Sequence, residues 1–148
     1  SYGIGTELSE IEVLVREESK AKYEDFVQRC EKESGRNISL KSLEQDLEEA
    51  CRCCDILVNA SSVGMKEDAS LVKESSWLRE GSFVADCIYH PLETKLLQQA
   101  RERGLQYMNG LPMLFYQGAE SFRLWTGKSF PEAEVYALLE SKVKEREG

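Results

Sequence analysis

The feature that most constrains the fold is a regular alternation of short apolar runs with longer segments of helical periodicity. Short apolar or β-branched runs predict strands, and apolar residues spaced three or four apart predict helices. A chain that alternates in this way is an α/β protein with a mainly parallel sheet covered by helices. The strands are expected at residues 11–15, 37–40, 55–59, 81–86 and 105–108, and the helices at 19–30, 42–50, 92–103, 112–125 and 131–145.

Capping and breaking residues stand near the ends of the expected helices. Ser19 and Ser42 are candidate amino-terminal caps, because their hydroxyls can accept a hydrogen bond from the first turn. Pro91 and Pro131 fit first helical positions, where the missing N–H is not needed. Gly104 is suited to end a helix. These signals support the element order read from the apolar pattern.

This order predicts a Rossmann-like, doubly wound sheet, with the whole chain forming one dinucleotide-binding domain. Such a domain normally begins with a strand and a glycine-rich phosphate loop, G-x-G-x-x-G, at a helix terminus. Here Gly3-Ile-Gly5 is only a partial match, and Leu8 stands where the third glycine is expected. We therefore expect the first strand and its loop to be missing.

A missing first strand has a structural consequence, because that strand lies at the centre of the order 3-2-1-4-5-6. Two half-sheets with unpaired edges would remain. The gap could be filled by a longer natural protein, by a second copy pairing through the sheet edges, or by an arrangement of residues 1–10. We favour the first of these. The run at 55–59 is expected to be a buried strand of one half-sheet.

Charge and composition exclude several classes of function. A formal net charge of −8 argues against a nucleic-acid partner, which requires clustered basic residues. No apolar run approaches the roughly 20 residues of a membrane span, so we expect no membrane partner and a cytoplasmic location. Cys51, Cys53 and Cys54 are crowded, which is typical of reduced thiols. With His90 as the single histidine, no metal site is expected.

Three ordered motifs follow the later expected strands. They are Asn59-Ala-Ser-Ser-Val-Gly-Met65, Asp86-Cys-Ile-Tyr-His-Pro-Leu-Glu-Thr-Lys-Leu-Leu97 and Asn109-Gly-Leu-Pro-Met-Leu-Phe-Tyr-Gln-Gly-Ala-Glu-Ser-Phe-Arg-Leu-Trp-Thr-Gly127. Their order and spacing resemble those of the carboxyl-terminal, NADP-binding domain of shikimate dehydrogenases. The resemblance is dense over about half of the chain, and the rest agrees with that domain in element order.

The resemblance implies an oxidoreductase of aromatic amino acid biosynthesis that interconverts 3-dehydroshikimate and shikimate with NADP(H). The nicotinamide would perform the hydride transfer. The family's catalytic Lys and Asp belong to an amino-terminal domain that has no counterpart here. No catalytic residue is therefore assigned to this chain, and the fragment alone is expected to be inactive.

The resemblance also implies roles for individual residues. Tyr89 and Gln117 correspond to residues that reach the substrate, and both carry suitable hydrogen-bond donors. Without the motifs, each would be expected to bond only to its protein neighbours. The expected cofactor-binding residues are Arg16, Lys20, Asn59, Ser61, Ser62, Cys87, Gly110, Met113 and Leu114.

Two departures from the family pattern affect the cofactor. Arg16 and Lys20 match the cations that hold the 2′-phosphate of NADP, but Val15 and Glu17 replace an Asn and a Thr of the family. A carboxylate near that phosphate would repel it. NADP is the expected cofactor, and NAD is not excluded. Pro112 replaces a usual Gly and removes a backbone donor beside the nicotinamide loop.

Two other interpretations stay open at this point. The chain could be a non-catalytic binding or assembly module that kept the fold and associates through its sheet edges. Within the enzymatic interpretation, the sequence does not distinguish shikimate from quinate as substrate. Lys95 is a poor substitute for the family's catalytic lysine, because a lysine on an amphipathic helix is usually solvated surface.

Overall fold

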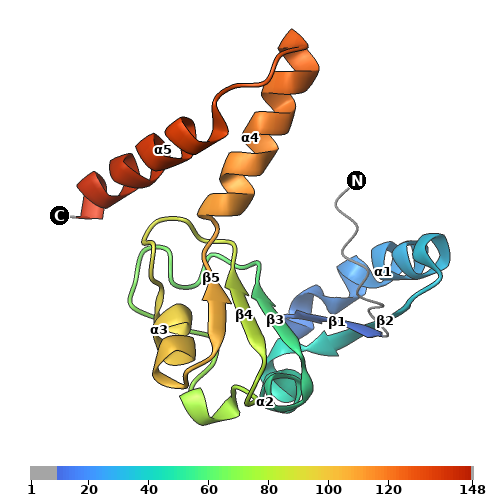
Figure 1. Cartoon of the computed structure of the whole chain (residues 1–148). Coiled ribbons are helices and arrows are strands. Elements are labelled where there is room, and N and C mark those ends of the chain that lie inside the picture. Colours follow the sequence, from blue (N-terminus) through green and yellow to red (C-terminus); the bar gives the residue numbers. More distant parts are fainter. Residues whose placement is uncertain (1–9, 148) are drawn as a thin grey trace. The chain divides into compact units, whose positions relative to one another are not determined.

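The computed structural model describes residues 10–147, so Gly3-Ile-Gly5 and Leu8 lie outside the described residues. Strands and helices alternate along the chain, as the apolar pattern predicts (Figure 1). The chain divides into two compact units, Ser1–Ala50 and Cys51–Gly148. The elements are β1 (Glu10–Val15), α1 (Lys20–Ser34), β2 (Asn37–Ser42), α2 (Leu43–Cys53), β3 (Ile56–Asn59), β4 (Phe83–Asp86), α3 (Lys95–Glu102), β5 (Gln106–Met108), α4 (Leu111–Thr126) and α5 (Glu132–Glu147), with 3-10 turns at Glu17–Ser19 and Ser75–Trp77.

The first unit contains a parallel pair of strands and the helix between them. β1 and β2 pair in register from Glu10 opposite Asn37 to Val15 opposite Ser42. α1 packs against β2 and buries Val27. Gly35 ends α1 with a φ of 65°, a left-handed conformation that glycine adopts without a steric penalty.

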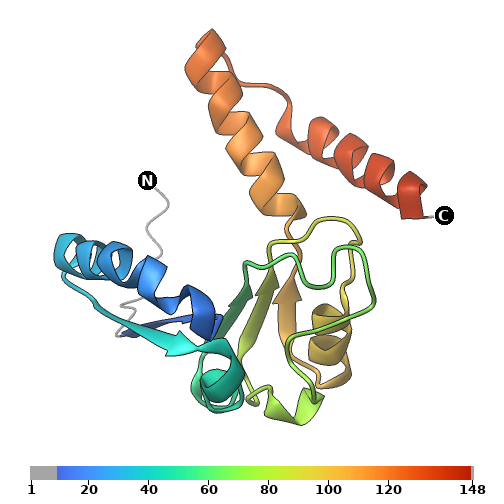
Figure 2. The same ribbon diagram turned by 180° about the vertical axis from the view of Figure 1, so that it is seen from behind.

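The second unit is built on a three-stranded parallel sheet in the order β3-β4-β5 (Figure 2). Helix α3 packs against β4 and β5. Each fully buried leucine or valine there contributes roughly 1.5–3 kcal/mol through the area it removes from water. The buried apolar side chains of this unit include Val72, Leu78, Val84, Ile88, Leu96, Leu97, Leu105 and Leu111.

Helices α4 and α5 form the end of the second unit. Phe115 of α4 is buried and meets Phe130 and Tyr136 edge-on, with ring centroids 5.7 and 5.1 Å apart. Such edge-to-face pairs each add roughly 0.5–1.5 kcal/mol beyond the area they bury. Gly127 ends α4 in the left-handed conformation. The aromatic cluster therefore joins the two helices.

The structure corrects the expectation that residues 55–59 form a buried strand. Ile56 and Val58 are 48% and 54% exposed. β3 is an edge strand of its sheet, and an edge strand of a thin sheet leaves alternate side chains uncovered. In the described part of the chain the strands form two separate parallel sheets, which agrees with the expected absence of a central strand.

Helix boundaries differ from expectation at several caps. α3 begins at Lys95, three residues later than predicted, because Thr94 caps it by accepting a hydrogen bond from the Leu97 amide. Pro91 therefore belongs to the preceding loop. Ser19 does precede α1, but its hydroxyl makes no capping hydrogen bond, since a 3-10 turn already leads into the helix.

The other two expected caps, Ser42 and Pro131, also differ in detail from the prediction. The hydroxyl of Ser42 donates to the Glu44 carboxylate, and the Ser42 amide donates to Asp46 at 2.7 Å. Pro131 lies one residue before α5, where its carbonyl accepts the Val135 amide. No helix within residues 10–147 is long and apolar enough to cross a bilayer.

Candidate functional site

The carboxyl ends of the three strands of the second unit meet at one edge of the sheet. Asn59, the last residue of β3, is paired with Asp86, the last residue of β4. On the other side, Ala85 of β4 pairs with Met108 of β5. Ligands of open parallel sheets bind at this edge, where the strand-to-helix loops gather. All three sequence motifs begin here.

The loop after β3 is folded around the side chain of Asn59. Its Oδ1 atom accepts hydrogen bonds from the amide and the hydroxyl of Ser61, at 3.0 and 2.7 Å. Its Nδ2 atom donates to the carbonyl of Val63 at 3.2 Å. Ser61 and Ser62 are exposed. The loop therefore presents small hydroxyl residues to the solvent on a defined backbone.

Asp86 lies behind this loop and is only 2% exposed. Its carboxylate accepts hydrogen bonds from the Asn59 side chain at 3.1 Å, from the Ile88 amide at 3.0 Å and from the Thr94 hydroxyl at 2.7 Å. Three partners satisfy a carboxylate that would otherwise be costly to bury. The ends of β3, β4 and α3 are thus tied to one group.

Gly110 joins the loop after β5 to the loop after β4. Its amide donates to the Ile88 carbonyl at 2.8 Å. A Cβ at position 110 would stand 2.0 Å from the Cys87 carbonyl oxygen, closer than any real contact. The backbone that Gly110 approaches is therefore that of Cys87 and Ile88. Asn109 adds a second tie, with its Nδ2 atom donating to the Leu92 carbonyl at 3.0 Å.

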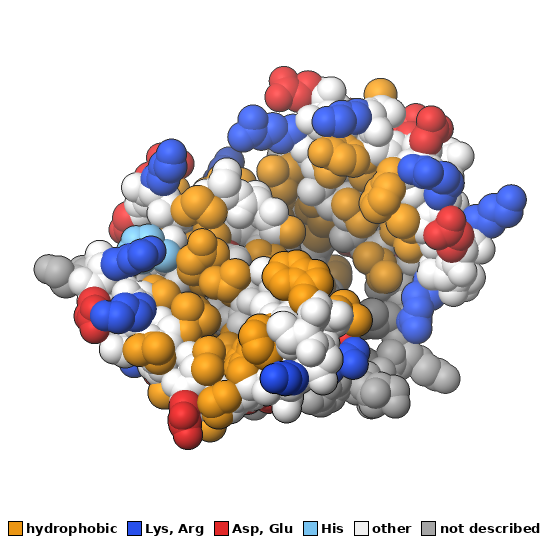
Figure 3. All heavy atoms as spheres, turned by 90° about the horizontal axis from the view of Figure 1, so that it is seen from above, with side chains coloured by type: hydrophobic (Ala, Val, Ile, Leu, Met, Phe, Trp, Pro, Cys, Tyr) orange, Lys and Arg blue, Asp and Glu red, His pale blue; other side chains and the backbone are white. Residues whose placement is uncertain are grey.

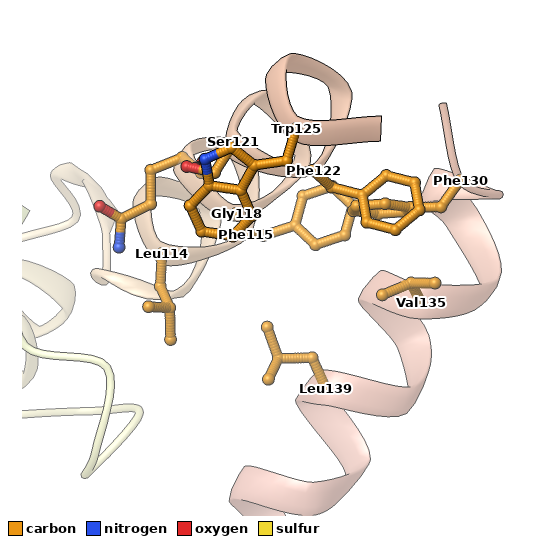
Figure 4. A pocket seen from close by; sticks show the side chains of 10 residues that line it. Leu114, Phe115, Gly118, Ser121, Phe122, Trp125, Phe130, Val135 and Leu139 are labelled. Carbon is orange, nitrogen blue, oxygen red and sulfur yellow. Dashed lines mark hydrogen bonds between the residues drawn. The ribbon is translucent and has the colours of Figure 1, made fainter. Parts of the chain in front are cut away.

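Helix α4 carries the other predicted residues of the second unit. Met113 is 52% exposed, and Tyr89, which lies in the loop after β4, is 41% exposed. Leu114 and Gln117 line a groove of about 480 Å³ between α4 and α5. In Figure 4, Leu114 faces this space from one helix, and Val135 and Leu139 face it from the other. Figure 3, a view from above, shows hydrophobic side chains exposed among charged ones.

The two predicted cations lie in the first unit. Arg16 is exposed and forms an ion pair with Glu18 at 4.0 Å, and Lys20 begins α1. Next to them, the Glu44 carboxylate accepts the Glu17 amide at 3.0 Å. Hydrogen bonds from its own backbone amide and then from that of Glu17 lower the pKa of Glu44. Arg16 therefore lies near the carboxylates of Glu18 and Glu44.

The structure thus brings Asn59, Ser61, Cys87 and Gly110 together at one sheet edge, and places Leu114 and Gln117 in the α4/α5 groove. Sequence reasoning gave no role to three residues that organise this edge, Asp86, Thr94 and Asn109. Their positions in the sequence could have identified them, because each is a polar residue that lies directly after an apolar run or between two such runs.

The cysteines show no sign of metal binding. Within residues 10–147, no group of three or more His, Cys, Asp or Glu side chains could hold a metal ion. Burial raises the pKa of the Cys51 thiol to about 12, so this thiol stays protonated at neutral pH. The cysteines of this part are free of disulfides.

The carboxyl edge of this parallel sheet carries small hydroxyl residues, a tightly packed glycine and the start of a helix. This arrangement defines the class of fold to which the second unit belongs. It is a partial Rossmann-like α/β domain.

Comparisons with known proteins show which proteins this chain is similar to. Residues 110–140 match the model of the shikimate 5′-dehydrogenase C-terminal domain. A shikimate dehydrogenase (NADP(+)) of Streptococcus pneumoniae is 43% identical over 139 residues, which are 93% of this chain and 49% of that protein. The chain therefore spans about half the length of the curated relatives it matches. By these matches the chain is similar to the carboxyl-terminal part of shikimate dehydrogenases.

Solved structures show a similar likeness. Shikimate 5-dehydrogenase from Listeria monocytogenes, determined with shikimate and NAD, is 32% identical with a TM-score of 0.82, over 88% of this chain and 47% of that one. Quinate dehydrogenase from Corynebacterium glutamicum, determined with NAD, has a TM-score of 0.81 over 93% of this chain and 48% of that one. At 23% identity, the latter shows the fold alone.

Proposed function

We propose that this chain is the cofactor-binding part of an NADP-dependent shikimate dehydrogenase, which interconverts 3-dehydroshikimate and shikimate. The observation that carries the proposal is the joining of three family motifs at the carboxyl edge of one parallel sheet, through Asn59, Asp86 and Gly110. The 43% identity to the Streptococcus pneumoniae enzyme supports the same activity.

The described residues suit a dinucleotide at this edge. The exposed loop at Ser61 and Ser62 offers hydroxyls and backbone to a polar cofactor, while Cys87 and Gly110 would flank the nicotinamide half. Met113 and Leu114 would supply an apolar wall. The bound nicotinamide would accept or donate the hydride.

The substrate would be bound next to the nicotinamide. Tyr89 and Gln117 are both exposed, and their hydroxyl and amide groups can orient the hydroxyls and carboxylate of a shikimate-like ring. We assign no catalytic residue to this chain and expect it to be inactive alone. Its relatives contain about as many residues again outside the matched region. The choice between shikimate and quinate is expected to depend largely on that other part.

We propose NADP as the cofactor, with NAD as the alternative. The Streptococcus pneumoniae relative is named for NADP(+), whereas the Listeria monocytogenes structure holds NAD. Arg16 and Lys20 would attract a 2′-phosphate, but Glu17, Glu18 and the ionised Glu44 oppose it. This balance of charge predicts a weaker preference for NADP than two unopposed cations would give.

The cofactor proposal can be tested by titrating NADP+ into the isotopically labelled chain and following amide chemical shifts. We expect saturable shifts at Ser61, Ser62, Cys87 and Gly110. The variant Ser62→Asp should raise the dissociation constant about tenfold, because it brings a carboxylate close to an anionic ligand. Ser129→Asp adds the same charge at an exposed site between α4 and α5 and should change it less than about twofold.

Two outcomes would contradict this proposal. One is an absence of saturable shifts at the carboxyl edge of the β3-β4-β5 sheet. The other is an equal loss of affinity in the Ser62→Asp and Ser129→Asp variants, which would indicate a response to net charge rather than a site.

A binding or assembly module is the second candidate function. The half-exposed apolar residues Ile56 and Val58 on the edge strand β3 favour it, because such an edge can pair with another chain. A stable homo-oligomer in sedimentation, lost on Val58→Lys, would support this candidate. A monomer over a wide concentration range would count against it. Neither candidate involves nucleic acid or a membrane, and a cytoplasmic location stays a prediction.

A further inference from the structure

The carboxylate of Asp86 has a place in the second unit that the proposed binding roles do not use. It is buried, yet its three hydrogen-bond donors come from three different segments: the end of β3, the loop after β4 and the cap of α3. Burying a carboxylate is costly even when it is well bonded, so stability alone is a weak reason for a charged group here.

On one side, the contacts of Asp86 lead to the loop after β3. Asn59 donates to Asp86 and to the Val63 carbonyl with the same Nδ2 atom, while its Oδ1 atom holds Ser61. The orientation of the Asn59 amide is therefore fixed by Asp86. A change at Asp86 would release the segment that presents Ser61.

On the other side, the contacts lead to the loops after β4 and β5. The Ile88 amide is held by Asp86, and its carbonyl accepts the Gly110 amide. Because Ile88 lies between Cys87 and Tyr89, fixing its peptide also fixes the start of those two side chains. Gly110 packs directly on the same peptide.

We propose that Asp86 is a positioning residue, which sets the three loops of the candidate site relative to one another without contacting the ligand itself. This inference rests on the proposed function for its purpose, but the geometry of the network can be tested without a ligand. Thr94 is the second member, since its hydroxyl donates to Asp86 and also accepts from the Leu97 amide at 3.5 Å.

The test compares four variants of the labelled chain. Asp86→Asn replaces the carboxylate by a group with one acceptor oxygen, and Thr94→Val removes the hydroxyl at nearly constant shape. Thr94→Ser keeps the hydroxyl and is the conservative rescue. Asp68→Asn is the matched control, because it neutralises an exposed aspartate that only approaches Lys95 at 3.9 Å.

The first readout is hydrogen exchange of the ligand-free chain. Exchange at the Ile88 amide should become about tenfold faster in Asp86→Asn, because its hydrogen bond loses the charge of the acceptor and is weakened. Thr94→Val should raise it several-fold, since it removes a neighbouring donor to the same carboxylate. In Thr94→Ser and Asp68→Asn, the exchange rate at Ile88 should stay within about twofold of the rate in the unsubstituted chain. The Val84 amide in the middle of β4 serves as the reference for global opening.

The second readout is the dissociation constant for NADP+, measured where every variant is folded. It should rise about tenfold in Asp86→Asn and stay within about twofold in Thr94→Ser. A role confined to stability would speed exchange at Val84 and Ile88 alike and would leave binding by the folded chain unchanged. That result would overturn the proposal.

The two proposals fail in different ways. If the unsubstituted chain shows no NADP+-induced shifts, the proposed function is contradicted, whereas Ile88 exchange still decides whether Asp86 holds the loops. If Asp86→Asn does not fold, Thr94→Val against Thr94→Ser provides the same comparison. Equal Ile88 exchange in those two variants would overturn the positioning role.

Discussion

At the scale of single residues, Gly110 shows how one missing Cβ allows two loops to meet. We expect Gly110→Ala to lower the free energy of unfolding by about 1–3 kcal/mol, because its Cβ would collide with backbone atoms of Cys87. Gly118→Ala is the matched control. An added Cβ at that position meets nothing within 4 Å, and the helix should gain about 0.5–1 kcal/mol.

Urea unfolding followed by circular dichroism measures both effects. Equal stability of Gly110→Ala and the unsubstituted chain would contradict the contact between Gly110 and the Cys87–Ile88 peptide.

Cys51 and Cys53 lie two residues apart in the sequence, but one is buried and the other is exposed. Burial raises the pKa of Cys51 to about 12, whereas Cys53 is exposed. Iodoacetamide at about pH 8 should therefore label Cys53 first and Cys51 only when the unit unfolds. Trypsin cleavage at Arg52 separates the two cysteines, so mass spectrometry can follow each. Equal labelling rates in the folded chain would contradict the buried position of Cys51.

The Cys51 thiol also affects the stability of the folded chain at high pH. Because the folded state raises the pKa of Cys51, the folded state holds a proton that the unfolded chain has already lost above about pH 9. The contribution of this thiol to stability is complete below that pH. It should decline as the pH rises towards about 12.

At the scale of elements, the sequence was a good guide to strands and a poorer one to helix ends. All five strands lie within two residues of their predicted positions, because short apolar runs mark them clearly. The start of α3 was wrong because Pro91 suggests a first helical position, while the tertiary bond between Thr94 and Asp86 sets the true cap. Such a bond joins a strand end to a helix cap eight residues further along the chain, and the local apolar pattern does not signal it.

Glu44 ties two strand-to-helix connections of the first unit together. Its carboxylate accepts the Glu17 amide and the Ser42 hydroxyl. The pKa of Glu44 is lowered, so its stabilising effect is complete above the ordinary carboxyl pKa and is lost as the pH falls through the lowered value. Hydrogen exchange at Glu17, corrected for intrinsic pH dependence, should accelerate in that acidic range.

In Glu44→Gln, hydrogen exchange at the Glu17 amide should already be fast at neutral pH and should not accelerate further in acid. Glu48→Gln, further along α2, is the control that should leave Glu17 unchanged. Protection of Glu17 that is independent of pH and of Glu44 would contradict this contact.

At the scale of the whole molecule, the likeness to shikimate dehydrogenases could be predicted from sequence, but the contacts that organise the candidate site could not. The motifs pointed to Tyr89 and Gln117, whose proposed roles depend on a bound ligand. They could not show that Asp86 joins the loops, since its three partners meet only in the folded sheet. Trp125 is 84% exposed on α4, a surface that a larger assembly would be expected to cover.

The measurement that tests the central claim most directly is shikimate-dependent reduction of NADP+ by a hybrid enzyme. In the hybrid, this chain replaces the 139 matching residues of the Streptococcus pneumoniae shikimate dehydrogenase. The account predicts that the hybrid reduces NADP+ only when shikimate is present, and that the chain alone does not. A folded hybrid that neither binds nor reduces NADP+ in the presence of shikimate, or turnover by the chain alone, would contradict the claim that this chain is the cofactor-binding part of a larger dehydrogenase.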